Sequence, residues 1–161
     1  MISRPLFLES ASEEDLEALV ELEQRCFSHP WTLRAFRLAM AHTERGRLVV
    51  LRGPFEAGDP ERGIAAYAAF EVVLDEMHIH TLAVHPLERS RGLGRRLLAS
   101  ILDLGVRRGA GLALLEVRQS NWAALALYRS FGFQSVAVRR GYYEHPREDA
   151  LLLEKRDLGP A

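Results

Sequence analysis

The stretch LAVHPLERSRGLGRRLL, residues 82–98, decides the fold. It begins with an apolar run typical of the end of a β-strand. Pro86 ends that strand, because proline has no amide hydrogen to give to a sheet. Two glycines and several arginines follow, and Leu97 and Leu98 then open the apolar stripe of a helix. The stretch therefore predicts a strand, a glycine-rich turn and a helix in succession.

The turn, Arg89-Ser90-Arg91-Gly92-Leu93-Gly94, has the composition of an anion-binding site. Glycine lets the backbone approach a ligand closely, and the helix that follows offers unpaired amide hydrogens and a partial positive charge. Full charges come from four arginines: Arg89, Arg91, Arg95 and Arg96. An ordinary strand-to-helix turn with solvated arginines explains the same residues equally well, so the turn alone leaves both interpretations open.

Two nucleotide-binding motifs can be compared with this turn. Gly92 and Gly94 match part of a dinucleotide fingerprint, but Leu97 stands where the third glycine is required. A Walker phosphate loop is excluded, because no Lys-Ser or Lys-Thr follows a glycine. A Rossmann-type nucleotide module is therefore only a weak alternative.

Length and composition predict one globular domain over residues 1–161. The chain has a mass of 18.2 kDa, with 48% apolar and 27% charged residues. Cys26 is the only cysteine, which excludes an internal disulfide and any site with several thiolates. His78 and His80 alternate on a predicted strand, but two histidines without a third ligand are poor evidence for zinc. We interpret both histidines as structural and expect no metal.

Charge and hydropathy limit the partners. The formal net charge is −1, so the whole molecule is no obvious nucleic-acid binder. No stretch approaches the roughly 18 apolar residues of a membrane span, and the start, MISRPLFLES, lacks the apolar core of a secretion signal. We expect a cytoplasmic protein that binds neither membrane nor nucleic acid directly, with a monomer as the default state.

The periodicity of apolar residues predicts a mixed α/β (α+β) fold. Helices are predicted over residues 13–26, 33–42, 93–108 and 122–130. Strands are predicted over residues 7–8, 47–51, 64–74, 77–85, 112–117, 133–142 and 149–154. The segment 52–63, rich in glycine and proline, is predicted to be a loop. This order predicts a central mixed sheet of about seven strands with four helices on both faces.

Short polar residues mark the expected ends of these elements. Ser10 and Ser12 compete to cap the first helix, and Ser10 has capping-box spacing to Glu13. Thr32 and Asn121 are expected to cap the second and fourth helices. A tight hairpin turn is expected at Asp75-Glu76.

The pattern resembles the GCN5-related N-acetyltransferase (GNAT) superfamily. The likeness rests on Arg-x-x-Gly-x-Gly after a strand ending in Leu82-Ala83-Val84, followed by a further strand and an asparagine-capped helix. In that superfamily the glycine-rich turn wraps the pyrophosphate of acetyl-coenzyme A, and the preceding strand receives the pantetheine arm. The resemblance implies a GNAT fold with acetyl-CoA as acetyl donor and Leu82, Ala83 and Val84 at the thioester. It implies pyrophosphate contacts from Arg89, Ser90, Arg91, Gly92, Leu93, Gly94 and Arg95.

Within the superfamily the chain resembles the ribosomal-protein-alanine N-acetyltransferases of bacteria. This narrower likeness rests on four segments: HPWT at 29–32, LEVRQSNWAALALY at 115–128, GFQSVAVRRGYY at 132–143 and REDALLLEK at 147–155. It implies acetylation of the N-terminal alanine of a small-subunit ribosomal protein, whose N-terminus is then the peptide partner.

The chemistry needs a base and an acid. An α-amino group with a pKa near 8 is largely protonated at neutral pH, so a carboxylate must take its proton before it attacks a thioester. The resemblance assigns this role to Glu116 and makes Tyr128 the proton donor to the leaving thiolate. An ion pair with Arg118 is the alternative for Glu116, and a core position is the alternative for Tyr128.

The resemblance implies three further contacts. Asn121 matches a coenzyme A contact, a role it could fill while also capping its helix. Tyr142 and Tyr143, expected in a loop after the sixth strand, resemble residues that line the peptide groove, although a strand edge predicts them almost as well. Two other functions remain open: acetylation of a small amine such as a polyamine or drug, and a non-catalytic subunit that binds coenzyme A.

Overall fold

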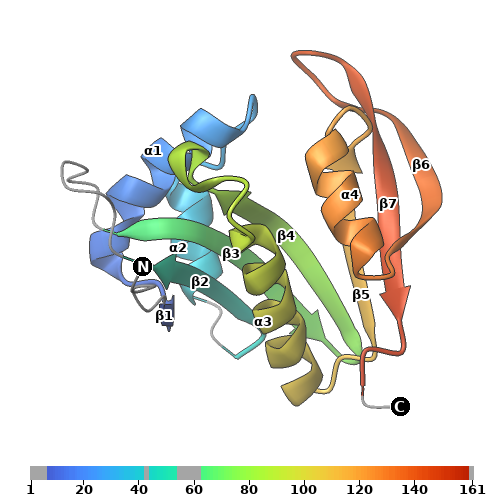
Figure 1. The fold of residues 1–161 in the computed structure, drawn as a ribbon, viewed down its shortest axis with the longest axis horizontal. Helices are drawn as coiled ribbons and strands as arrows, with labels where there is room; N and C mark the ends of the chain where they lie inside the picture. Colours follow the sequence, from blue (N-terminus) through green and yellow to red (C-terminus); the bar gives the residue numbers. More distant parts are fainter. Residues whose placement is uncertain (1–6, 42–43, 54–62, 160–161) are drawn as a thin grey trace. The chain divides into compact units, whose positions relative to one another are not determined.

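The computed structural model describes residues 7–41, 44–53 and 63–159 (Figure 1). The strands are β1 (Phe7–Ser10), β2 (Gly46–Arg52), β3 (Ile64–Val73), β4 (Glu76–Val84), β5 (Leu112–Arg118), β6 (Gln134–Tyr143) and β7 (Glu148–Arg156). The α-helices are α1 (Leu16–Cys26), α2 (Leu33–Ala41), α3 (Leu93–Arg107) and α4 (Trp122–Ser130), and the 3-10 turns are η1 (Glu13–Asp15) and η2 (Pro86–Glu88).

The strands form one mixed sheet of seven in the order β1-β2-β3-β4-β5-β7-β6, which confirms the predicted fold class. β4 and β5 are parallel, whereas β1 with β2, β5 with β7 and β6 with β7 are antiparallel. The chain divides into two compact units. The first comprises the described residues up to Phe70 with Thr81–Ala99, and the second comprises Glu71–His80 with the described residues from Ser100.

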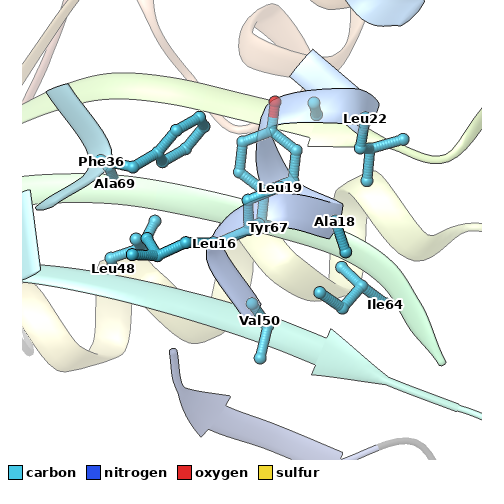
Figure 2. Packing of buried hydrophobic residues seen from close by; sticks show 11 residues of the cluster. Leu16, Ala18, Leu19, Leu22, Phe36, Leu48, Val50, Ile64, Tyr67 and Ala69 are labelled. Carbon is cyan, nitrogen blue, oxygen red and sulfur yellow. The ribbon is translucent and has the colours of Figure 1, made fainter. Parts of the chain in front are cut away.

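The core of the first unit lies between α1, α2 and the strands β2 and β3 (Figure 2). Its buried side chains are Leu16, Ala18, Leu19, Leu22, Phe36, Leu48, Val50, Ile64, Tyr67, Ala69 and Ala83. The four members from α1 recur at the spacing of one helix face, as expected for an amphipathic helix. Phe36 meets the Tyr67 ring edge-on at 5.9 Å between centroids.

A buried carboxylate belongs to this unit. Glu23, on α1, is only 2% exposed. One of its oxygens accepts the backbone N–H of Trp31 at 3.1 Å and the other accepts the Tyr67 hydroxyl. Burial raises the pKa of Glu23, although these hydrogen bonds and one from Thr81 oppose the rise. The carboxylate thereby connects α1 to the chain before α2 and to the strands β3 and β4.

A second buried carboxylate, Asp15, is the last residue of η1 and bonds back to the cap residue Ser12. The Ser12 backbone N–H donates to Asp15 Oδ2 at 2.8 Å, so Ser12 with Asp15 forms the capping box. The expectation for Ser10 and Glu13 is wrong, because Ser10 is already paired in β1 with Val49. Arg52 Nη2 also donates to Asp15 Oδ2, at 2.7 Å.

The second unit is a sheet of β5, β7 and β6 joined to the first half of β4. β5 alternates regularly between buried and half-buried residues. α3 approaches β4 at Gly105, where an added Cβ would lie 2.5 Å from Met77 Sδ. An alanine at this position would therefore require the Met77 side chain to move.

The observed ends of several elements refine the sequence expectations. Thr32 and Asn121 cap their helices as predicted, through bonds to the amides of Ala35 and Ala124. The hairpin turn lies at Leu74–Asp75, one residue earlier than expected, because β4 already begins at Glu76. The predicted loop 52–63 falls mostly on residues 54–62, outside the described part. In the described residues no helix is long and apolar enough to cross a membrane.

Replacing Asp15 by asparagine tests the capping cluster. Burial opposes ionisation of Asp15, but bonds from Arg52 and Ser12 outweigh it and lower the pKa of this carboxyl. We expect Asp15→Asn to reduce the free energy of unfolding by about 1–3 kcal/mol at neutral pH. A lowered folded pKa gives stability that is complete above the unfolded pKa near 4 and is lost as pH falls through the folded value. The difference between the two proteins, measured by urea denaturation, should therefore shrink below about pH 4.

Glu17→Gln is the matched control, because Glu17 is exposed on the adjacent turn of α1. It should change the free energy of unfolding by less than about 0.5 kcal/mol. An Asp15→Asn protein as stable as the parent at neutral pH contradicts the assigned role.

Candidate active site

The end of β4 carries the residues expected at the thioester. Ala83 is buried in the core of the first unit, whereas Leu82 and Val84 on either side of it are half-buried. The Val84 carbonyl accepts from Arg89 Nε at 3.3 Å and from the Cys26 thiol at 3.7 Å. The strand is thus tied at its last residue to the following turn and to the end of α1.

Cys26 has no features of a nucleophile. Burial raises the pKa of its thiol, although Arg89 Nη2 at 3.5 Å from the sulfur opposes this rise. The thiol therefore stays protonated at neutral pH. Its contacts with the Val84 carbonyl and the Arg89 guanidinium connect the end of α1 to the start of the turn.

The glycine-rich turn has the backbone shape that its composition predicts. Gly92 has a φ of +78° and Ser90 a φ of +62°, so both lie in the left-handed region. An added Cβ at Gly92 would have nothing within 4 Å, which means that space is open over the backbone there. The first helical bond runs from the Arg96 amide to the Gly92 carbonyl at 3.1 Å. The amides in the first turn of α3 are thus presented next to an open, glycine-lined surface, an arrangement suited to an anion.

The side chains of the turn divide into two groups. Arg91 is exposed and pairs with Glu88 at 3.0 Å, and Arg89 is folded back onto Val84 and Cys26. Arg95 is exposed on the first turn of α3, whereas Leu93 is buried and anchors the helix start. Arg89 therefore serves the local structure of the turn, whereas Arg91 and Arg95 place positive charge at the surface.

The second unit holds the expected base. Glu116 lies in β5, with its side chain 25% exposed, and its Oε1 is 3.0 Å from Arg139 Nε. The alternative pairing with Arg118 is not what holds this carboxylate, since its ion pair comes from β6. Arg118 contacts Glu148 at 3.3 Å. Glu116 is thus fixed by a strand two positions away in the sheet.

Tyr142 and Tyr143 lie beside Glu116. They are the last two residues of β6, so the expectation that they lie in a loop is wrong, because the β6–β7 ladder extends to Tyr143 and Glu148. A hydrogen bond to Glu116 raises the pKa of Tyr142, and burial followed by the Glu116 charge raises the pKa of Tyr143 to about 12. Both phenols therefore remain protonated at neutral pH, next to the carboxylate.

α4 positions the last two predicted residues. Asn121 Oδ1 accepts the Ala124 amide at 3.2 Å and caps the helix. Tyr128 is 6% exposed and meets the Phe133 ring edge-on at 5.6 Å. Burial, with a smaller effect of Tyr143, raises the pKa of Tyr128. Tyr128 is therefore both a core aromatic and a phenol that keeps its proton, so the two interpretations of this residue are compatible.

The sequence profile of the acetyltransferase (GNAT) family matches residues 16–133. The chain belongs to the GNAT family. The chain is 36% identical over 148 residues to the ribosomal protein bS18-alanine N-acetyltransferase of Escherichia coli (strain K12), an alignment that covers 91% of this chain and 94% of the relative. It therefore spans nearly the whole length of that enzyme.

Solved GNAT structures agree with the fold. The crystal structure of the ribosomal-protein-S18-alanine N-acetyltransferase from Escherichia coli matches with a TM-score of 0.83 and 35% identity, covering 98% of this chain and 96% of that one. Arabidopsis thaliana NAA60 in complex with acetyl-CoA matches with a TM-score of 0.84 at 16% identity, covering 94% and 98%. At 16% identity, the similarity to NAA60 shows only that the two proteins share a fold.

Two features near Glu116 were not expected from the sequence: its ion pair with Arg139, and the contacts that Arg118 makes with the end of β6 and the segment after it. The Arg118 guanidinium lies 4.3 Å above the Tyr143 ring and donates to the carbonyls of Glu144 and Pro146. No sequence signal could have found these contacts, because they depend on which strands become neighbours. Among the described residues, no group of three or more His, Cys, Asp and Glu could hold a metal ion.

Proposed function

We propose that this chain is an N-terminal acetyltransferase that transfers the acetyl group of acetyl-CoA to the N-terminal alanine of a ribosomal protein of the bS18 type. The observation that carries the proposal is the nearly full-length similarity to an enzyme of that name. Ribosomal proteins are made in the cytoplasm, which is where we place the reaction. The binding and catalytic roles below rest on this proposal.

The turn at Ser90–Arg95 suits the pyrophosphate of the acetyl donor. The open space over Gly92 admits a ligand close to the backbone, and the α3 amides favour negative charge. The amide and carbonyl groups of Leu82 and Ala83 would receive the pantetheine arm in the manner of an added strand. Asn121, at the start of α4, would contribute a further polar contact to the donor.

Glu116 takes the first proton. The substrate α-ammonium must lose a proton before its nitrogen has a lone pair, and a carboxylate within reach can accept it directly or through water. Arg139 and Tyr142 hold the Glu116 carboxylate in one position. The amine then attacks the thioester carbon directly: the C–N bond forms, the C–S bond breaks, and its electron pair goes to sulfur. No acyl-enzyme is needed, because a thioester is already activated.

Tyr128 supplies the proton that sulfur requires. A phenol with a raised pKa is a weak acid, so it could not protonate a thiolate dissolved in water. The apolar surroundings raise the pKa of Tyr128. They would also raise the pKa of a thiol placed beside it, because desolvation disfavours the phenolate and the thiolate alike. The transfer therefore becomes feasible when the sulfur leaves into the same environment. The second proton that the attacking nitrogen loses on becoming an amide then returns the Tyr128 phenolate to the phenol.

A panel of substrates tests the function. Peptides that start with alanine and match the N-terminus of bS18 should be acetylated at the α-amino group, as read by mass spectrometry. The same peptides with blocked N-termini should not react. Free polyamines should react at least about tenfold more slowly than the alanine peptide, because they lack the peptide groups that the enzyme would contact. Preferred acetylation of the small amines contradicts the proposal, and acetyl-CoA binding without turnover on any amine indicates a non-catalytic subunit.

Replacing Glu116 by glutamine tests the base. Glutamine keeps the size of the side chain but accepts no proton, so we expect kcat/KM on the alanine peptide to fall by about 10²–10⁴-fold. Glu154→Gln is the matched control, because Glu154 is a carboxylate on β7 opposite Leu114 and pairs with Arg156. It should stay within about threefold of the parent. Full activity of Glu116→Gln at neutral pH contradicts the assignment.

Replacing Tyr128 by phenylalanine tests the acid. The ring still packs against Phe133, so folding should be retained, but the proton donor is lost. We expect kcat to fall by about 10²-fold with little change in the Kd of acetyl-CoA measured by calorimetry. A large loss of affinity with an unchanged rate would reassign Tyr128 to binding.

A further inference from the structure

Tyr142 and Tyr143 are adjacent residues of β6 that break the alternation of a regular strand. Neighbouring residues in a β-strand normally point to opposite faces of the sheet. Here the two rings meet edge-on, with 5.1 Å between their centroids. Each ring also lies next to an arginine. Arg139 Cζ is 5.7 Å from the centre of the Tyr142 ring, and Arg118 Cζ is 4.3 Å from the centre of the other ring.

Both arginines belong to the face of the sheet that carries Glu116. Arg118 lies two residues after Glu116 on β5, so the two side chains point the same way. Arg139 Nε is 3.0 Å from Glu116 Oε1. Tyr142 and Tyr143 therefore both stand on the Glu116 face, although a regular strand would bring only one of them there.

A β-bulge in β6 accounts for this arrangement. The β6–β7 register pairs Arg139 with Ala150 and next pairs Tyr143 with Glu148. Three residues of β6, 140–142, therefore stand opposite a single residue of β7. A surplus of residues in one strand bends that strand locally and re-aims its side chains. The direction of the first tyrosine side chain is thus set by the bulge.

Gly141 and Asp149 hold the bulge. Gly141 has a φ of +60°, in the left-handed region that favours glycine. Its amide donates to Asp149 Oδ1 at 2.8 Å. The Asp149 backbone carbonyl accepts the Gln119 amide at 3.2 Å, so Asp149 is itself tied to the segment after β5. The Asp149 carboxylate thus supplies the acceptor for a backbone amide within the bulge.

The position of the catalytic base depends on this bulge. We propose that Asp149 is a positioning residue for Glu116 and that it acts through the direction of Tyr142. The Asp149 carboxylate holds the bulge at Gly141, and the bulge turns Tyr142 toward Glu116. Tyr142 and Arg139 then confine the carboxylate that takes the proton of the substrate amine. The role of Asp149 therefore rests on the proposed function.

Replacing Asp149 by alanine tests this role, because alanine leaves the Gly141 amide without its acceptor. We expect kcat on the alanine peptide to fall by at least about fivefold, with an unchanged Kd for acetyl-CoA, since a misplaced base slows the chemical step. Asp149→Asn should keep at least about half of the parent kcat, because its side-chain oxygen can still accept the Gly141 amide.

Asp103→Ala is the matched control. Asp103 is an exposed carboxylate in the same unit, where it pairs with Arg107 on α3. Losing a surface ion pair of this kind should leave kcat within about twofold of the parent.

A double-mutant cycle separates positioning from a general effect on stability. If Asp149 acts through Tyr142, removing the Tyr142 hydroxyl already releases the base. Asp149→Ala should then cost less than about twofold in kcat in the Tyr142→Phe background. A loss that came only from weaker folding would be the same in both backgrounds. Thermal melting shows that each variant is folded at the assay temperature.

Two substitutions at Gly141 test the same bulge without changing Asp149. In Gly141→Asn and Gly141→Val alike, an added Cβ would lie 3.0 Å from Arg147 Nε, so the crowding at this atom is equal. Asparagine tolerates a positive φ, whereas a β-branched residue does not, so we expect Gly141→Asn to retain a kcat at least about threefold above that of Gly141→Val.

Four results overturn the role of Asp149: a parent kcat in Asp149→Ala, an equal loss in Asp149→Asn, the same loss in both backgrounds of the cycle, or equal kcat in the two Gly141 variants. In each case a parent that acetylates the alanine peptide and an inactive Glu116→Gln leave the proposed function standing. A parent that acetylates no alanine peptide overturns the proposed function and, with it, the role of Asp149.

Discussion

The placement of β5 between β4 and β7 is the constraint on which the surroundings of Glu116 depend. Antiparallel pairs join it to β7 from Leu112 with Arg156 to Arg118 with Ala150, and parallel pairs join it to β4. Because side chains alternate with a period of two, a slip of one residue would turn Glu116 into the core and expose Val117. The buried residues of β5 prevent that slip, since each would lose its apolar contacts.

The strand order of the same sheet brings Arg139 and Tyr142 into contact with Glu116. Arg139 and Tyr142 come from β6, which pairs with β7 rather than with β5, so both side chains reach Glu116 across an intervening strand. Arg118 secures the connection between β6 and β7 through its contacts with two backbone carbonyls and Glu148. Arg139 therefore holds the Glu116 carboxylate, and Arg118 holds the segment that carries Tyr142 and Tyr143.

Two buried carboxylates in the first unit have pKa values shifted in opposite directions, because one has a charged partner and the other has neutral ones. Asp15 is 4% exposed, yet its pKa is lowered because Arg52 supplies a full charge. Glu23 is similarly buried, but its partners are neutral donors, and its pKa is raised. Hydrogen bonds alone compensate less of the desolvation penalty than a paired charge does. Asp15 stabilises the start of a helix, and Glu23 joins three segments of the core.

Local patterns in the sequence were sufficient for the order of elements, the caps at Thr32 and Asn121, and the glycine-rich turn before α3, because these depend on residues close together in the chain. The residues expected for catalysis came from resemblance to a family. Tertiary structure alone decided that Arg139 and Tyr142 meet Glu116, that Tyr142 and Tyr143 belong to a strand, and that Ser12 rather than Ser10 caps the first helical segment. Strand order and register bring residues from distant parts of the sequence together, and no local pattern encodes which strands become neighbours.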